Sequence, residues 1–132
     1  MSNYQWPCLI TWLTLVLLMA LSLNVGRARG RYNVHAPATT GDPVFERYYR
    51  VQMNTLESAL VFLPALWLGS WYWSPLWSSV SGLVWLAGRV WYAQAYVHDP
   101  KSRSGGFGLS ATALFVLLIA AAVGWVRSFA LG

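Results

Sequence analysis

Three polar residues that could bind a charged ligand share one face of a predicted helix. Arg50, Asn54 and Glu57 are spaced i, i+4 and i+7, which places their side chains on one side of an α-helix. Directly after them, residues 58–88 contain no charged residue, as expected of a segment inside a lipid bilayer. A charge entering a bilayer costs roughly 2.5–3.5 kcal/mol on insertion scales, so it persists mainly where it faces a partner, a cavity or a ligand. The pattern therefore predicts a polar binding site at a membrane edge.

A second polar face follows on the next predicted helix, where Arg89, Tyr92 and Tyr96 are spaced i, i+3 and i+7. Arg103 lies near the same layer, in the short flexible turn that residues 101–106 are expected to form after that helix. The whole layer is expected to contain Arg29, Arg50, Gln52, Asn54, Glu57, Arg89, Tyr92, Tyr96 and Arg103. Guanidinium groups bind carboxylates, often through two parallel hydrogen bonds, and a glutamate accepts from an ammonium group. Such a set suits a small, flexible zwitterion with several carboxylates and amides, such as a tripeptide thiol.

Other kinds of site have weak support in the sequence. His35 and His98 are isolated, and no spacing of His, Cys, Asp and Glu resembles a metal-ligand set. No credible Ser–His–acid arrangement is present. The single Cys8 lies in the first apolar segment, where a thiol is more often inert packing than a nucleophile. We therefore expect no metal cofactor and no catalytic cysteine.

The composition indicates an integral membrane protein. Of the 132 residues, 57% are hydrophobic and only 10% are charged, whereas about 25% of a soluble domain is charged. The uncharged stretch 58–88 is too long for one span of roughly 20 residues, and Ser74–Pro75 is the natural break within it. The sequence predicts an all-α fold, a single four-helix membrane domain over residues 1–132 with transmembrane helices near 6–27, 43–73, 76–98 and 105–129.

The second predicted helix has a clear start and is longer than a membrane is thick. Asp42 is a good N-cap, Pro43 fits the first helical position, and Glu46 places negative charge near the positive end of the helix dipole. The helix is about 46 Å long, against a hydrocarbon core of ~30 Å. Its first turns, with Arg50 and Glu57, are therefore expected at the interface, within reach of both water and lipid.

Basic residues gather in two of the expected connections between helices: Arg27, Arg29, Arg31, Lys101 and Arg103. By the positive-inside rule, these two connections are cytoplasmic and both termini lie on the opposite side of the membrane. The net charge of +5 is scattered over short segments and forms no extended basic face. We therefore expect contact with anionic membrane lipid and no nucleic-acid partner.

Two stretches resemble motifs of the MAPEG superfamily, the membrane-associated proteins of eicosanoid and glutathione metabolism. The first runs from Phe45 to Glu57, FERYYRVQMNTLE, and is followed by Phe62-Leu63-Pro64. The second, GRVWYAQAY from Gly88 to Tyr96, is similar to the third-helix motif of the leukotriene C4 synthase and microsomal glutathione transferase branch. The approach Thr39-Thr40-Gly41 matches as well. The resemblance thus covers essentially the whole chain.

The resemblance implies a homotrimer of four-helix subunits, with glutathione bound at each subunit interface near the cytosolic side. Carried over by position, the residues that hold the peptide from one subunit are Arg50, Asn54, Glu57 and Tyr92. Those that complete the site, some from the neighbouring subunit, are Arg29, Gln52, Tyr96 and Arg103, with Arg89 in a supporting role. Arg103 follows Tyr96 by seven residues, as does the arginine that activates the thiol in that branch. It is the candidate catalytic residue.

The resemblance implies a glutathione transferase, with glutathione peroxidase activity left open. A free thiol has a pKa of ~8.5, and lowering it by one unit requires ~1.4 kcal/mol of selective thiolate stabilisation, which a guanidinium in a partly dry site can supply. The thiolate would attack a hydrophobic electrophile or a lipid hydroperoxide that arrives from the bilayer.

Other interpretations remain open at this stage. Arg50 and Glu57 could simply neutralise each other, and Tyr92 and Tyr96 could be ordinary interfacial tyrosines. Arg29 is most simply a topology signal. A non-catalytic lipid-binding or scaffold protein of the same family is the alternative function, although it has no need for a thiol-activating cation. A channel or transporter is disfavoured because the polar residues are confined to one end of the helices.

Overall fold

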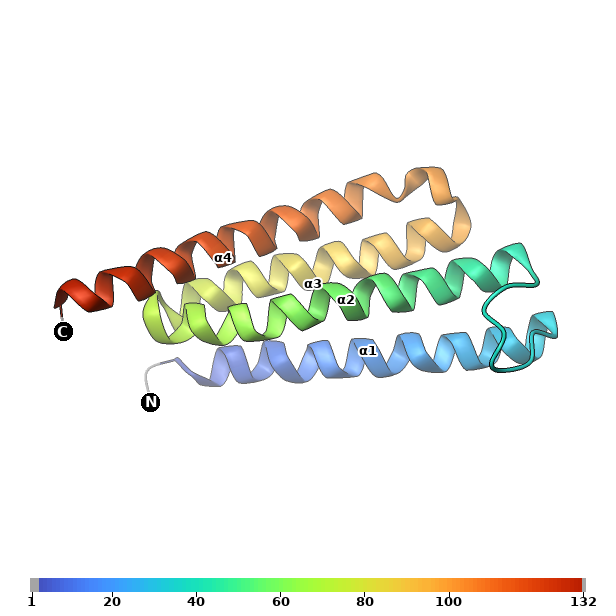
Figure 1. Cartoon of the computed structure of the whole chain (residues 1–132), viewed down its shortest axis with the longest axis horizontal. Helices are drawn as coiled ribbons and strands as arrows, with labels where there is room; N and C mark the ends of the chain where they lie inside the picture. The colour runs from blue at the N-terminus through green and yellow to red at the C-terminus, as the bar shows by residue number, and fades with distance from the viewer. Residues whose placement is uncertain (1–2, 132) are drawn as a thin grey trace.

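Four long helices and one short 3-10 turn form the protein. The computed structural model describes residues 3–131, with helices α1 (Gln5–Tyr32), α2 (Pro43–Tyr72), α3 (Pro75–His98) and α4 (Ser104–Leu131), and the turn η1 (Pro100–Ser102). The helices run up and down in one bundle (Figure 1). The start of α1, the α2–α3 turn and the end of α4 lie at one end, which we call the terminal end. The α1–α2 and α3–α4 connections lie at the opposite end, called the pocket end.

Local capping determines where α2 and α3 begin. The Asp42 Oδ1 atom accepts hydrogen bonds from the backbone N–H groups of Val44 and Phe45 at 2.9 and 3.0 Å. The Ser74 hydroxyl oxygen accepts from the N–H of Trp77 at 3.1 Å. In both helices a proline occupies the first turn, where its missing N–H has no helical partner to lose. The predicted cap at Asp42 and the predicted break at Ser74–Pro75 are confirmed.

The predicted end of the first helix at residue 27 is wrong. α1 continues to Tyr32 and ends where Asn33 adopts a left-handed conformation with φ 56°, its N–H donating to the Arg29 carbonyl. Arg29 and Arg31 therefore lie in the last turn of α1, not in the connection that follows. Arginine has a good helix propensity, and positive charge is favourable near the negative end of the helix dipole, so nothing in these residues stops the helix earlier.

The α3–α4 connection is also shorter than predicted. The flexible turn expected over 101–106 is replaced by η1 and by the first turn of α4, which already includes Gly105 and Gly106. Gly106 lies directly against α3, where an added Cβ atom would meet the Tyr92 Cα at 2.7 Å and the Gly88 carbonyl oxygen at 2.8 Å. The glycines of this segment therefore allow close helix packing instead of forming a loop.

The main core lies in the middle of the bundle. Phe62 of α2 stacks on Trp85 of α3 with ring centroids 4.0 Å apart and an interplanar angle of 6°. The Trp85 indole N–H donates to the Ser58 hydroxyl at 3.0 Å, so its polar group is satisfied inside the core. Leu66 and Leu117 are fully buried beside them. This core holds α2 and α3 together just beyond the predicted polar layer.

Two segments, α1 and the Pro100–Leu131 segment that contains α4, are long and apolar enough to cross a membrane. Many of their large apolar side chains are exposed, including Trp12, Met19, Phe115 and Phe129. The prediction of four helices is confirmed, whereas membrane crossing by all four stays a prediction.

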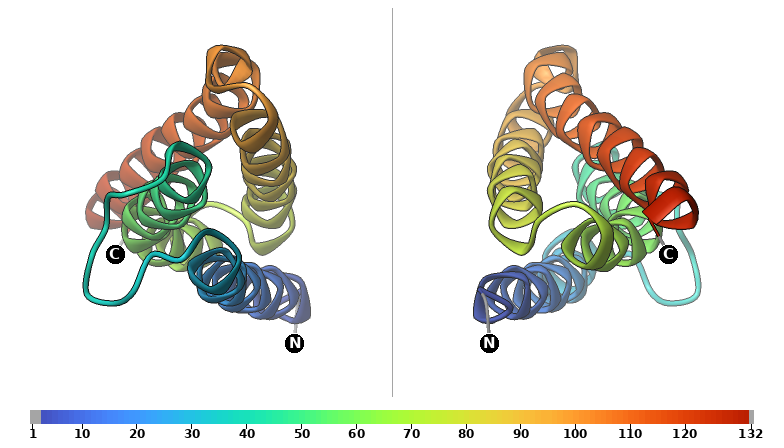
Figure 2. Two further views of the ribbon diagram at one scale, coloured as in Figure 1. Left: turned by 90° about the vertical axis from the view of Figure 1, so that its right-hand side faces the viewer. Right: turned by 90° about the vertical axis from the view of Figure 1, so that its left-hand side faces the viewer.

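The direction of α4 across the bundle decides where the protein is open. At the pocket end α4 packs on α3, through Gly106 against Tyr92 and Ser110 against Gly88. At the terminal end it packs on α2, because Gly124 touches the backbone of Tyr72. The end-on views of Figure 2 show this crossing of α4 from α3 towards the end of α2. The first half of α2 is thereby left without α4 as a close neighbour.

Candidate functional site

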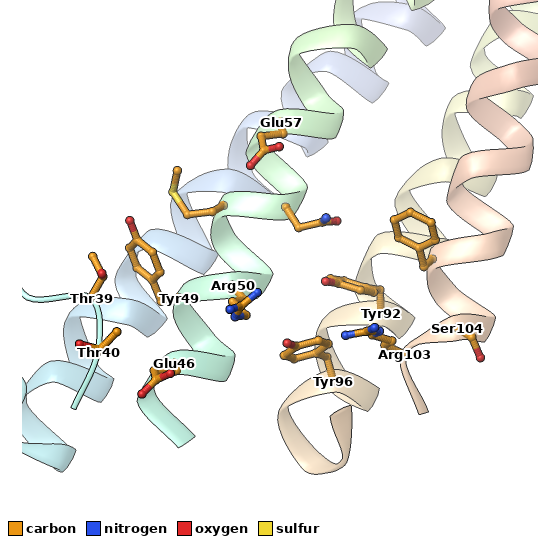
Figure 3. A pocket seen from close by; sticks show the side chains of 13 residues that line it. Thr39, Thr40, Glu46, Tyr49, Arg50, Glu57, Tyr92, Tyr96, Arg103 and Ser104 are labelled. Atoms are coloured by element: carbon orange, nitrogen blue, oxygen red, sulfur yellow. The ribbon is translucent and has the colours of Figure 1, made fainter. Parts of the chain in front are cut away.

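A cavity of about 700 Å³ occupies the space that α4 leaves uncovered at the pocket end. One wall is the first half of α2, and the facing wall is the end of α3 with the start of α4 (Figure 3). Six of the residues predicted from the sequence line it: Arg50, Asn54, Glu57, Tyr92, Tyr96 and Arg103. Its volume falls within the range of ~300–1,000 Å³ that is typical of small-molecule pockets.

The α2 wall carries charge of both signs. Arg50, Asn54 and Glu57 follow one another along the face of α2 that lines the cavity, as their helical spacing predicts. Among residues 3–131, no ion pair within 4.0 Å joins Arg50 to Glu57. The simple explanation that these two residues neutralise each other therefore has no support, and both charges remain free to meet a ligand.

The opposite wall is aromatic with one cation at its edge. The rings of Tyr92 and Tyr96 lie 5.5 Å apart, and Phe107 of α4 lies 6.2 Å from Tyr92. The Arg103 guanidinium carbon is 5.9 Å from the centroid of the Tyr96 ring. A cation over an aromatic face is attracted by the ring quadrupole. This contact leaves the N–H donors of Arg103 free for an anion.

Arg89 lies behind the cavity and not in it. Its side chain is only 1% exposed, and it donates hydrogen bonds to Asn54 of α2 at 2.6 Å and to Ser110 of α4 at 3.3 Å. Its guanidinium carbon is also 4.3 Å from the centroid of the Tyr92 ring. Arg89 thus touches two lining residues, Asn54 and Tyr92, which agrees with a supporting role.

Arg29 and Gln52 do not line the cavity of the single chain. The Arg29 guanidinium lies 5.0 Å from the Phe45 ring centroid and donates to the carbonyl oxygens of Val34 and Ala38 at 3.3 and 2.7 Å. Gln52 follows Arg50 by two residues, so it points about 200° around α2 from it. A ligand role for either residue in the site of a neighbouring subunit stays a prediction.

Several lining residues were not among the candidates from the sequence: Thr39, Thr40, Glu46, Tyr49, Met53, Ser104 and Phe107. Helical periodicity could have found Glu46 and Met53, since they lie four residues before and three after Arg50. Phe107 follows Arg103 by four residues, but it lies in the predicted apolar helix near 105–129, where nothing distinguishes it from the other apolar residues. Thr39 and Thr40, in the α1–α2 connection, have no such signal because a loop has no fixed period.

The arrangement can bind a small zwitterion without a metal ion. Arg50 and Arg103 offer guanidinium groups from opposite walls, and Glu57 offers a carboxylate to an ammonium group. Within the described part of the chain, no group of three His, Cys, Asp or Glu side chains could hold a metal ion. The residues that line the cavity offer guanidinium, carboxylate, amide and phenol groups.

Comparison with known proteins gives a consistent result. A family model described as the MAPEG family matches residues 8–123. An uncharacterized protein of Synechocystis, sll1147, is 47% identical over 120 residues, which is 91% of this chain and 88% of that protein. Microsomal glutathione S-transferase 2 of Homo sapiens is 40% identical over 82% of this chain and 74% of its own length. Leukotriene C4 synthase of Bos taurus is 37% identical over 91% and 80%, respectively.

Proposed function

Because the chain belongs to the MAPEG family, we propose that it is a membrane-bound enzyme that uses glutathione to conjugate or reduce hydrophobic electrophiles. Two relatives with known names, microsomal glutathione S-transferase 2 and leukotriene C4 synthase, support glutathione as the co-substrate. The observation that carries the proposal is the cavity that combines Arg50 and Glu57 on one wall with Arg103 on the other.

Three charged lining residues, Arg50, Glu57 and Arg103, each have a partner in the tripeptide. Arg50 binds a carboxylate of glutathione, for which a guanidinium offers two parallel N–H donors. Glu57 accepts from the ammonium group at the γ-glutamyl end. The phenols of Tyr92 and Tyr96 complete the wall on which the peptide lies.

Arg103 activates the sulfur. A guanidinium beside the thiol stabilises the anionic form, and a stabilisation of ~1.4 kcal/mol lowers a thiol pKa by one unit from ~8.5. With an aryl halide, the thiolate forms a bond to the ring carbon and the halide leaves with the bonding electron pair. With a lipid hydroperoxide, the sulfur takes the terminal oxygen, the O–O bond breaks, and the alkoxide is protonated to an alcohol. A second glutathione then displaces the hydroxyl from sulfur to give glutathione disulfide and water.

The membrane supplies the second substrate. The cavity also contains apolar side chains, those of Met53 and Phe107, beside its charged groups. A hydrophobic electrophile that is dissolved in the bilayer can enter on that side, whereas glutathione enters from water.

The proposal includes four transmembrane helices, a homotrimer and a cytoplasmic pocket end. The basic residues Arg27, Arg29, Arg31 and Lys101 lie at the pocket end, as the positive-inside rule requires of a cytoplasmic side. Arg29 and Gln52 lie outside the cavity of their own chain and are available to a neighbouring one. Native mass spectrometry of the detergent-solubilised protein tests the proposed homotrimer. A purely monomeric protein would contradict it.

The Arg103→Ala variant tests the proposed thiol activation. We expect turnover with a model aryl halide to fall at least ~100-fold, a loss of ~2.7 kcal/mol of transition-state stabilisation. Glutathione binding should largely survive, because Arg50 and Glu57 remain. In a pH series, the thiolate absorbance of bound glutathione should appear below pH ~8.5 in the unaltered protein and shift upwards in the variant, since loss of the cation raises the thiol pKa.

Lys101→Ala is the matched control, because Lys101 is a nearby exposed cation on η1 that does not line the cavity. Its turnover should equal that of the unaltered protein. Unchanged turnover in Arg103→Ala would exclude the proposed thiol activation. A protein that binds lipid but shows neither glutathione binding nor turnover would instead be the non-catalytic lipid-binding or scaffold member of the family.

A further inference from the structure

Arg89 is a buried cation whose hydrogen-bond acceptors are all neutral. Its Nη2 atom donates to Asn54 Oδ1 at 2.6 Å and to the Thr55 hydroxyl at 3.0 Å, and its Nη1 atom donates to the Ser110 hydroxyl at 3.3 Å. A buried charge is costly unless it is paired or well hydrogen-bonded. Among residues 3–131 no carboxylate forms an ion pair with Arg89. Two helices, α2 and α4, therefore supply neutral oxygen atoms to one guanidinium of α3.

The orientation of the Asn54 amide follows from the chemistry of its contact with Arg89. A guanidinium has only N–H donors, so the part of the amide that faces Arg89 must be its carbonyl oxygen. A flipped amide would place its own N–H₂ group against the N–H groups of Arg89, two donors against each other. The amide nitrogen of Asn54 is therefore held away from Arg89, whichever way the side chain is drawn.

Asn54 also lines the cavity, between Arg50 and Glu57 along α2. Within the described residues its amide nitrogen donates to no other side chain or backbone carbonyl. The positive charge of Arg89 lies next to the Asn54 Oδ1 atom, where it polarises the amide and makes its N–H groups better donors. We infer that Arg89 is a positioning residue that fixes Asn54 as a hydrogen-bond donor to a carbonyl or carboxylate oxygen of the ligand.

This inference deepens the proposed function, because it assigns a specific recognition role to the amide that lies between the two charged residues. The ligand group at this position must be an acceptor. A peptide carbonyl or a carboxylate of glutathione meets that requirement, whereas an ammonium group does not. Arg89 itself never touches the ligand in this arrangement.

Two substitutions at Asn54 separate the roles of its oxygen and its nitrogen. Asn54→Asp keeps an oxygen for Arg89 and removes the N–H₂ donor, whereas Asn54→Leu removes both. Glutathione affinity, measured by isothermal titration calorimetry on the detergent-solubilised protein, should fall roughly tenfold or more in both variants. The melting temperature should be retained or raised in Asn54→Asp, because a carboxylate pairs with Arg89, and lowered in Asn54→Leu, because Arg89 loses an acceptor.

Ser58→Ala is the matched control on the same helix. It removes the hydrogen bond from Trp85 to Ser58, another contact between α2 and α3, and Ser58 does not line the cavity. We expect a lower melting temperature and a glutathione affinity within about twofold of the unaltered protein.

Arg89→Lys provides a further test of positioning, since it keeps a positive charge but not the fork of donors. It should raise KM for glutathione several-fold while kcat at saturating glutathione stays within about twofold, because Arg103 is untouched. Full glutathione affinity in Asn54→Asp would overturn the inference. A loss of glutathione affinity in Ser58→Ala that equals the loss in Asn54→Leu, when both variants have the same melting temperature, would also overturn it. If the unaltered protein binds no glutathione, both the proposed function and this inference are wrong. Full binding of glutathione by Asn54→Asp is a different result, which contradicts the inference alone.

Discussion

The two ends of the bundle are built in opposite ways from the same four helices. At the terminal end, glycine and serine residues bring the helices into contact. An added Cβ atom on Gly69 would meet the Ser78 hydroxyl oxygen at 2.6 Å and the Leu117 Cδ1 atom at 2.9 Å. At the pocket end, α4 packs equally closely on α3, but α2 lies across the cavity from both. The cavity therefore comes from a change of neighbour along α4 and not from loose packing.

Charge follows the same division. At the pocket end, Arg50, Glu57 and Arg103 line the cavity. At the terminal end, the close contacts involve uncharged residues such as Gly69, Ser78 and Leu117, and the turn between α2 and α3 carries no charge. Ligand recognition is thus concentrated at the pocket end, whereas close helix packing occurs at both ends, and substitutions should separate the two properties.

The largest effect is expected where α3 and α4 meet at the pocket end. Gly106→Leu places a side chain against the backbone of Tyr92 and Gly88, which cannot move aside as a flexible side chain could. We expect a loss of more than ~3 kcal/mol in stability and little folded protein by fluorescence-detected size-exclusion chromatography. Gly108→Leu, two residues along α4 with no atom within 4 Å of the added Cβ, is the control and should fold normally. Equal behaviour of the two variants would show that the close α3–α4 contact does not support the fold.

A smaller effect is expected at the terminal end. Gly124→Leu pushes α4 away from the backbone of Tyr72 and Trp73. Because Gly124 lies near the end of α4, the last turns can move outwards, so we expect a loss of about 1–3 kcal/mol in stability. Glutathione affinity, measured by calorimetry below the melting temperature, should stay within about twofold of the unaltered protein. A strong loss of affinity would mean that the two ends are coupled through α4.

The smallest effect on stability is expected from substitutions of the two N-cap residues, which should differ in their effect on glutathione binding. Asp42→Ala and Ser74→Ala each remove an N-cap, at the pocket end and the terminal end respectively, and each should cost about 0.5–2 kcal/mol of stability by thermal melting. Asp42 holds the first turn of α2, which leads to Glu46 and Arg50 in the cavity. Only Asp42→Ala should therefore raise KM for glutathione. An equal change in KM for both variants would argue against a local role of the α2 start.

The elements and one wall of the site could be predicted because their signals are local. Asp42 and Ser74, each followed by proline, mark two helix starts by their own capping chemistry. The Arg50–Glu57 spacing defines one helix face in any surroundings. The resemblance to the MAPEG superfamily is confirmed by the family model that matches residues 8–123.

Other predictions were wrong or incomplete because they depended on contacts between helices. The sequence predicts the end of α1 too early, because charged residues after an apolar segment are typical of a connection between helices. The sequence predicts a flexible turn at Gly105 and Gly106, which lie in α4, because a sequence does not distinguish a glycine that bends the chain from one that allows a neighbouring helix to approach. Arg29 does not line the cavity of its own chain, because its Nη1 atom donates to carbonyl oxygens of the connection to α2, and its role in a neighbouring site stays a prediction.

By itself, the sequence determined four helices, their apolar character and the polar face of α2, because helical periodicity and capping act within a few residues. Only the tertiary structure decided that α4 passes from α3 to α2, that a cavity opens beside Arg50, and that Arg89 turns the Asn54 carbonyl away from that cavity. The physical reason is that the angle at which helices cross depends on where small residues of different helices meet. That meeting is a property of the packed bundle and not of any single segment.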